Sequence, residues 1–216
     1  MNRFLQKALA AIAALSVAGG ISLAQETPEK LAQKTPDKFT QKNPEKQVYM
    51  AANAHFDTQW RWNVRQSIGE FLPNTLYQNF ALMEQYPDYK FSFEGAVKHY
   101  WTKEYYPHLY STLVKYVKEG RWYPAGASWD ANDFNVPSAE SNFKNILLAE
   151  EFYKAEFGVK SYDIMLPDCF GFGYALPSIA SHCGVFAFHT QKLKWRNNPF
   201  YEGGKKWPFE FGIWEG

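Results

Sequence analysis

Residues 138–168 read "SAESNFKNILLAEEFYKAEFGVKSYDIMLPD", and this run contains a helix followed by a short strand. Apolar side chains recur at steps of three or four residues, at Phe143, Ile146, Ala149, Tyr153 and Phe157. This spacing is typical of a helix with one buried face, which begins after Pro137 and ends at Gly158. The next run, "SYDIMLPD", is short and apolar, which indicates a buried strand.

The same alternation extends along the chain in both directions. The predicted strands cover residues 47–55, 89–95, 121–128, 161–168 and 185–192. The helices between them cover about 70–86, 96–120 with an interruption near Pro107, 138–157 and 175–184. Strands that alternate with helices predict an α/β fold with a mostly parallel sheet or barrel. In such folds the active site lies at the carboxyl ends of the strands.

Metal-binding residue types follow two of the predicted strands. His55 and Asp57 lie at the end of the first strand, and Asp168 lies at the end of the fourth. Residues i and i+2 of an extended segment point the same way, so His55 and Asp57 can reach one cation. Imidazole nitrogen and carboxylate oxygen are ordinary zinc ligands. A His-x-Asp triplet is common by chance, but its position at a strand end favours a metal site.

Other polar and aromatic residues allow more than one interpretation. Asp133 follows the third strand, where it could bind a substrate or cap the next helix, and its place at a strand end favours binding. Asp130 and His99 are expected to be structural. Trp62 could line a pocket or pack in the core. Cys169 has no base-like partner in the sequence, so a nucleophilic cysteine is not expected.

Three segments together resemble the N-terminal catalytic domain of glycoside hydrolase family 38, the zinc-dependent retaining α-mannosidases. The segment "AHFDTQW" is similar to the first zinc motif of the family, and "PDCFGFGYALPSIAS" is similar to its nucleophile motif. Between them lies "GRWYPAGASWDANDFNVPSAES". The resemblance runs from about Val48 to Gly216. It implies a distorted seven-stranded (β/α) barrel, of which the five predicted strands are the first part.

The resemblance also implies roles for individual residues. His55 and Asp57 would be zinc ligands, and Asp168 would be the catalytic nucleophile and a third zinc ligand. Trp60 resembles the tryptophan beside the −1 sugar, and Lys192 stands where some relatives have an arginine near the zinc. The implied reaction is hydrolysis of terminal α-linked mannose from an oligosaccharide or N-glycan.

The resemblance is incomplete in two respects. The family's fourth zinc ligand is a histidine well downstream of the nucleophile, and the general acid also comes from beyond Gly216. We therefore expect residues 47–216 to be an incomplete catalytic domain that carries part of the site. Two alternatives remain open, an inactive exported remnant and a metal-dependent polysaccharide deacetylase. A deacetylase would use metal-bound water and usually more than one histidine, so the single His-x-Asp favours the mannosidase.

The N-terminal region predicts export. Arg3 and Lys7 precede an apolar run from Ala8 to about Ala18, and Ser22-Leu23-Ala24 has small residues at the −3 and −1 positions of a cleavage site. This order is typical of a secretory signal peptide over residues 1–24. The apolar run is shorter than a typical transmembrane helix. We expect a periplasmic or extracellular protein with no stable membrane span after cleavage.

Composition and spacing describe the rest of the chain. Residues 25–46 contain three proline units spaced by eight residues and many charges, which indicates a solvated linker. With 23 basic and 22 acidic residues, the chain has no electrostatic footprint for nucleic acid. Cys169 and Cys183 are too few for a disulfide scaffold. They could pair in an oxidising compartment, but both are expected to be buried thiols.

Overall fold

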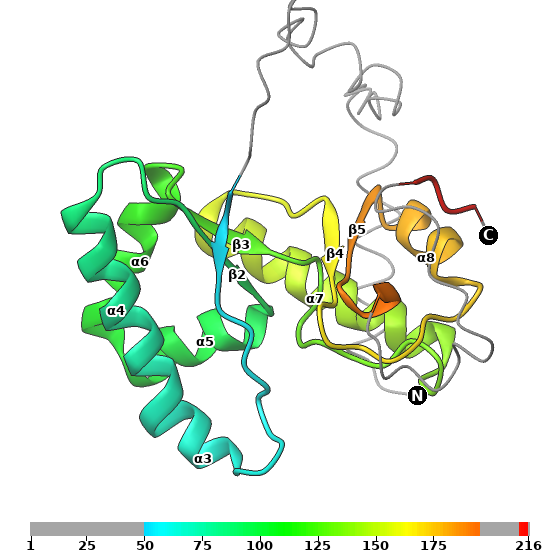
Figure 1. The fold of residues 1–216 in the computed structure, drawn as a ribbon, viewed down its shortest axis with the longest axis horizontal. Coiled ribbons are helices and arrows are strands. Elements are labelled where there is room, and N and C mark those ends of the chain that lie inside the picture. Colours follow the sequence, from blue (N-terminus) through cyan, green and yellow to red (C-terminus); the bar gives the residue numbers. More distant parts are fainter. Residues whose placement is uncertain (1–49, 195–211, 216) are drawn as a thin grey trace, which may run out of the picture. The chain divides into compact units, whose positions relative to one another are not determined.

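A computed structural model of the chain describes residues 50–194 and 212–215 (Figure 1). The predicted signal peptide and linker lie outside the described residues. So do the first three residues of the first predicted strand. No helix among the described residues is both long and apolar enough to cross a bilayer.

All five predicted strands are present, and each is shorter than its apolar run. The strands are β1 (Ala52–Asn53), β2 (Phe91–Glu94), β3 (Trp122–Ala125), β4 (Asp163–Met165) and β5 (Ala187–His189). The helices are α3 (Val64–Gln66), α4 (Leu72–Gln85), α5 (Ala96–Tyr105), α6 (Pro107–Lys118), α7 (Ala139–Phe157) and α8 (Leu176–His182). A π-helical turn (Ser67–Phe71) joins α3 to α4, and a 3-10 turn (Lys192–Lys194) follows β5. The α/β prediction is confirmed.

The described strands form two parallel sheets in place of the single sheet that we expected. One sheet has the order β1-β2-β3, and the other pairs β4 with β5. The chain turns at Gly126 after β3, and the Ala127 amide donates to the Asp163 carbonyl at 2.6 Å. This single backbone hydrogen bond links the two sheets, but it does not extend the β-ladder from β3 to β4.

The helix ends follow their local sequence. The Ser138 hydroxyl caps α7 by accepting from the Ser141 amide, and Gly158 ends the helix in the left-handed conformation. Pro107 begins α6, because proline lacks an amide hydrogen and fits the first turn of a helix. The helical path before β2 begins at Val64, earlier than predicted. A capping box between Asn63 and Gln66 begins it.

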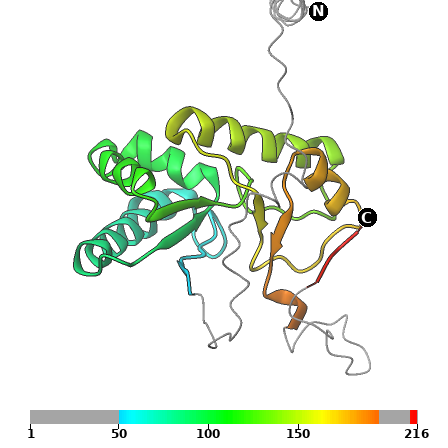
Figure 2. The same cartoon turned by 90° about the horizontal axis from the view of Figure 1, so that it is seen from above.

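Helix α7 runs alongside both sheets (Figure 2), and its buried side chains belong to two hydrophobic cores. It packs against α5 and α6 on the side of the first sheet and against α8 on the side of the second. Tyr153 belongs to the first core together with Phe91 and Phe93 of β2. Ile146 belongs to the second core, together with Ile164 of β4.

Side chains along β2 point alternately to the two faces of the first sheet. Phe91 and Phe93 point to the helices, so Ser92 and Glu94 point to the opposite face of the sheet.

Candidate active site

A small pocket collects residues that follow three different strands. Its volume is about 100 Å³. It is lined by His55, Asp57, Ala131, Asn132, Asp133, Leu166, Pro167, Asp168 and Cys169. These residues follow β1, β3 and β4 in the chain. The pocket therefore lies at the carboxyl ends of parallel strands, as expected for an active site in this class of fold.

One ring nitrogen of His55 contacts Glu94, and the other has no hydrogen-bond partner among the described residues. Its Nδ1 lies 2.9 Å from Oε1 of Glu94. Its Nε2 lies 3.7 Å from Oδ1 of Asp57, is buried, and has no hydrogen-bond partner among the described residues. With the Nδ1 hydrogen donated to Glu94, the neutral ring presents the Nε2 lone pair toward Asp57. This pair of donors fits a divalent cation such as zinc.

Glu94 and Lys98 form a buried ion pair behind His55. Each side chain is 1% exposed, and Nζ of Lys98 lies 2.8 Å from Oε1 of Glu94. Burial pushes the pKa of Glu94 upward, but the hydrogen bond from His55 and the charge of Lys98 outweigh it and leave that pKa lowered. The hydrogen bond to Glu94 raises the pKa of His55 against the opposing effect of burial. Glu94 is therefore an ionised acceptor for the Nδ1 hydrogen of His55.

Asp168 lies in the same pocket but faces a lysine. Its Oδ1 forms an ion pair with Nζ of Lys192, which follows β5. The ammonium group of Lys192 also lies 4.4 Å from the centre of the Phe170 ring. Among the described residues, no three histidine, cysteine, aspartate or glutamate side chains stand close enough to hold one ion together. His55 and Asp57 are close, while Asp168 is engaged by Lys192.

The two aspartates after β3 have different surroundings. Asp133 lines the pocket, and its Oδ1 accepts from the Asn135 amide at 2.6 Å. Ser138 caps α7, so the interpretation of Asp133 as the helix cap is wrong. Asp130 accepts from the Thr58 hydroxyl at 2.6 Å and so ties the loop after β3 to the loop after β1. Its expected structural role agrees with that contact.

The two tryptophans of the first motif lie outside the pocket lining. Trp60 is 62% exposed, and the guanidinium of Arg61 lies 4.4 Å above its ring. Trp62 packs edge-on against Phe71 at 4.8 Å and donates to the Ser67 hydroxyl at 2.9 Å. Trp62 therefore anchors the loop, and Trp60 is exposed at the surface, outside the pocket lining.

Residues 45–215 match the model of the N-terminal domain of glycosyl hydrolases family 38. The chain belongs to this family. It is 35% identical over 170 residues to Alpha-mannosidase G of Dictyostelium discoideum, covering 79% of this chain and 15% of that protein. It is 32% identical over 148 residues to Alpha-mannosidase 2C1 of Homo sapiens, covering 68% of this chain and 14% of that protein. The chain thus spans about one seventh of the length of these family 38 relatives.

Solved structures share the fold at low sequence identity. An alpha-mannosidase from Enterococcus faecalis V583 has a TM-score of 0.59 and 20% identity, with 65% of this chain and 16% of that chain covered. A 4-alpha-glucanotransferase from Thermococcus litoralis has a TM-score of 0.52 and 16% identity, with 67% and 22% covered. These likenesses concern the fold alone. The predicted resemblance to family 38 is confirmed by the family match.

The cysteines of this family 38 chain are free thiols. Cys169 lines the pocket and Cys183 follows α8, and both are partly buried. Burial first, and then the nearby aspartates, raise the pKa of Cys169 to about 11. A thiol with this pKa is protonated at neutral pH, which agrees with the expectation that Cys169 is not a nucleophile.

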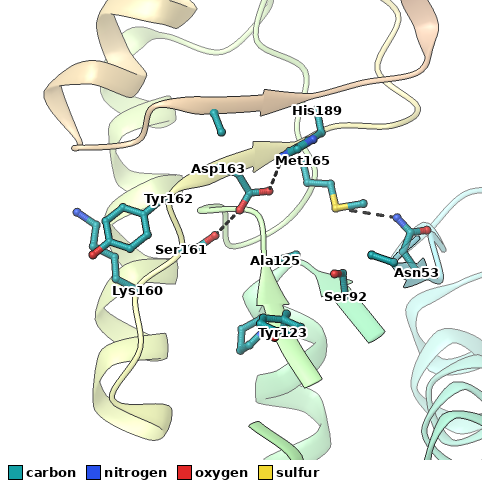
Figure 3. Close-up of a pocket in the computed structure, with 13 residues that line it drawn as sticks. Asn53, Ser92, Tyr123, Ala125, Lys160, Ser161, Tyr162, Asp163, Met165 and His189 are labelled. Atoms are coloured by element: carbon teal, nitrogen blue, oxygen red, sulfur yellow. Dashed lines mark hydrogen bonds and ion pairs between the residues drawn. The ribbon is translucent and has the colours of Figure 1, made fainter. Parts of the chain in front are cut away.

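A second, larger pocket of about 470 Å³ contains none of the predicted site residues (Figure 3). It lies over strand residues that face away from the helices, including Ser92 of β2 and Met165 of β4. Asp163 accepts from the Ser161 hydroxyl at 2.8 Å and lies 3.7 Å from Nε2 of His189. Because the predicted residues His55, Asp57 and Asp168 line the smaller pocket, that pocket remains the candidate active site of the family 38 domain.

Glu94 is the site residue that the sequence analysis missed. It ends β2 as His55 follows the end of β1, and the segment "YKFSFEG" placed a carboxylate at that strand end. A carboxylate as the last residue of an apolar strand was therefore the available signal.

Proposed function

We propose that the protein containing this chain hydrolyses terminal α-linked mannose from oligosaccharides or N-glycans with retention of anomeric configuration. Membership of family 38 and the names of the relatives support the reaction and the sugar. The observation that carries the proposal is the shared pocket of His55, Asp57 and Asp168 at the carboxyl ends of parallel strands. The proposed fold of the complete domain is the seven-stranded (β/α) barrel, with β1 to β5 as its first strands.

Zinc is the proposed metal, held by Nε2 of His55 and by the carboxylates of Asp57 and Asp168. Bound zinc supplies a Lewis acid for neighbouring hydroxyl groups of the sugar. The unpartnered Nε2 and the nearby Asp57 support this ligand set. Asp168 would exchange its contact with Lys192 for the metal, and the released ammonium group could then donate to a sugar hydroxyl.

Asp168 is the proposed nucleophile. Its carboxylate attacks the anomeric carbon as the bond to the leaving-group oxygen breaks, and a covalent glycosyl ester forms. Water then attacks the same carbon and releases Asp168, so two inversions give net retention. Asp133 is the proposed acceptor for a sugar hydroxyl, because it lines the same pocket. Trp60 keeps its proposed place beside the sugar: its ring is exposed, and a sugar would stack on it in place of the Arg61 guanidinium. The general acid and a further metal ligand are proposed to come from outside the described residues.

The test uses the full-length protein and an aryl α-mannoside. We expect turnover, first release of the α-anomer of mannose by NMR, and loss of turnover with a chelator that zinc restores. Asp168→Asn is expected to remove nearly all turnover. Asp88→Asn is the matched control, because Asp88 is exposed in the turn before β2. First release of the β-anomer, or full turnover in Asp168→Asn, contradicts the proposal.

We also propose that residues 1–24 direct export and are removed. The intact mass of the exported protein should correspond to a chain that begins at Gln25. An exported protein that still carries Met1 contradicts this assignment.

A further inference from the structure

Lys98 is a buried cation that the proposed mechanism leaves without a role. Its side chain is 1% exposed, and its ammonium group lies 4.8 Å from the centre of the Phe56 ring and 5.5 Å from that of Phe93. It donates a hydrogen bond to Oε1 of Glu94 at 2.8 Å. A buried charge is costly unless it is paired, so Lys98 and Glu94 depend on each other.

The pair continues to the imidazole of His55. The same Glu94 oxygen accepts from Lys98 and faces Nδ1 of His55 at 2.9 Å. Strands β1 and β2 are parallel with Asn53 opposite Ser92, so two residues further on His55 comes opposite Glu94. A lysine side chain is only a donor, and a carboxylate bonded to it is an acceptor. The contacts therefore run in one direction, from Lys98 and from His55 into Glu94.

Which nitrogen of His55 carries hydrogen follows from this arrangement. Nδ1 donates to Glu94, and Nε2 is buried without a partner among the described residues, on the side of Asp57. Glu94 bonds the ring at the opposite nitrogen, so it cannot ligate an ion held at Nε2. A carboxylate in this position orients a ligating histidine and increases its basicity.

We propose that Lys98 is a positioning residue for a metal ion at His55. Acting through Glu94, it holds the ring with hydrogen on Nδ1 and the Nε2 lone pair directed at the ion. This inference rests on the metal site of the proposed function, and it assigns a role to a residue that touches neither the metal nor the sugar.

The first experiment compares Lys98→Met with Lys103→Met in the full-length protein. Lys103 lies on the same helix and pairs with another carboxylate, Glu156, at 2.7 Å. Zinc affinity is measured by competition with a chromophoric chelator. Loss of a residue behind a metal ligand typically costs about 10- to 100-fold in affinity. We expect a loss of that size in Lys98→Met and unchanged affinity in Lys103→Met.

A double variant covers the case in which Lys98→Met does not fold. Glu94→Gln with Lys98→Met removes both charges and keeps the volumes, and the amide oxygen can still accept from Nδ1. We expect this variant to fold, as judged by circular dichroism, and to bind zinc at least about tenfold more weakly than wild type. Wild-type zinc affinity in either folded variant overturns the inference.

A direct measurement needs no substitution. Nitrogen-15 NMR of the zinc-loaded wild type, with labelled histidine, should place the His55 ring hydrogen on Nδ1 and the metal on Nε2. Metal on Nδ1 overturns the inference. Turnover is not used in these experiments. If the protein binds zinc through this arrangement but does not hydrolyse mannosides, only the proposed reaction is contradicted. If it hydrolyses mannosides and Lys98→Met leaves the zinc affinity unchanged, only this inference is contradicted.

Discussion

Asp168 and Lys192 form an ion pair although they follow different strands, β4 and β5. The side chain of Lys192 is 12% exposed, whereas that of Asp168 is 39% exposed. The carboxylate thus remains open to the pocket while a largely buried ammonium group compensates its charge. A cation and Lys192 would compete for the same oxygen atoms.

Replacing Lys192 by methionine should separate metal binding from turnover. Zinc affinity should rise by about tenfold, or about 1.4 kcal/mol, which is roughly a third of the 4 kcal/mol interaction between two unit charges at 4 Å near a protein surface. The kcat/KM for an aryl mannoside should fall about 10- to 100-fold, because one charged hydrogen bond is worth roughly 1.5–3 kcal/mol. Chelator competition and steady-state kinetics measure the two effects. Lys118→Met, at an exposed position of α6, is the control. Weaker zinc binding in Lys192→Met contradicts the competition.

His99 should make the fold sensitive to mild acid. Its ring is fully buried, with Nδ1 at 3.1 Å from the Gly95 carbonyl and Nε2 accepting from the Trp122 indole at 3.1 Å. Burial lowers the pKa of His99 to about 4. The neutral ring is favoured in the folded state, so stability is complete above the unfolded pKa of about 6.5 and is lost as the pH falls toward 4. The loss should be roughly 3 kcal/mol.

Urea unfolding at pH 7 and pH 4.5 measures this effect. In His99→Gln the decrease in the free energy of unfolding between the two pH values should be smaller than in wild type. His108→Gln is the control, because His108 is exposed on α6. Equal decreases in wild type and His99→Gln contradict the lowered pKa of His99 as the cause of the acid sensitivity.

Glu150 should act with the opposite sign. Burial raises its pKa to about 7, despite the hydrogen bond that it accepts from the Ser161 amide. An acid with a raised folded pKa resists ionisation, so wild-type stability is reduced as the pH rises from the unfolded value of about 4.5 through 7. Glu150→Gln keeps the acceptor and should raise the Tm at pH 8 without raising it at pH 4. Thermal scans measure this, with exposed Glu151→Gln as the control. A higher Tm at both pH values would contradict the ionisation argument.

Gly126 should be the more sensitive of two left-handed glycines. Its φ is +72°, and an added Cβ would lie 3.3 Å from Cβ of Met165 and 3.4 Å from its amide nitrogen. Gly158 has φ +69° with nothing within 4 Å of an added Cβ. Both changes to alanine carry a conformational cost of about 1–2 kcal/mol. Gly126→Ala must also separate β3 from β4, so its free energy of unfolding should fall further. Equal losses for both variants by urea titration refute the close approach.

The sequence predicted the elements well where local rules act alone. The start of α7 after Pro137 and its end at Gly158 lie where expected, because both depend on the backbone of a few neighbouring residues. The placement of His55, Asp57 and Asp168 at one pocket followed from strand order. The division into two sheets did not, because it depends on how much backbone pairs across Gly126.

The contacts within the site were harder to predict. The link from Lys98 through Glu94 to His55 depends on a contact between two strands, because His55 and Glu94 lie 39 positions apart. Only the alternation of β2 determines which face Glu94 takes. Trp60 was expected in the pocket from its motif, but its ring packs on its own neighbours, which the motif does not encode.

Helix α7 determines how the molecule unfolds locally, because it belongs to both hydrophobic cores. One continuous helix buries Ile146 in the core beneath β4 and Tyr153 in the core beneath β2. Neither core can be exposed to water without disturbing the helix that serves the other. We therefore expect the amide hydrogens of the two sheets to exchange through one shared opening event.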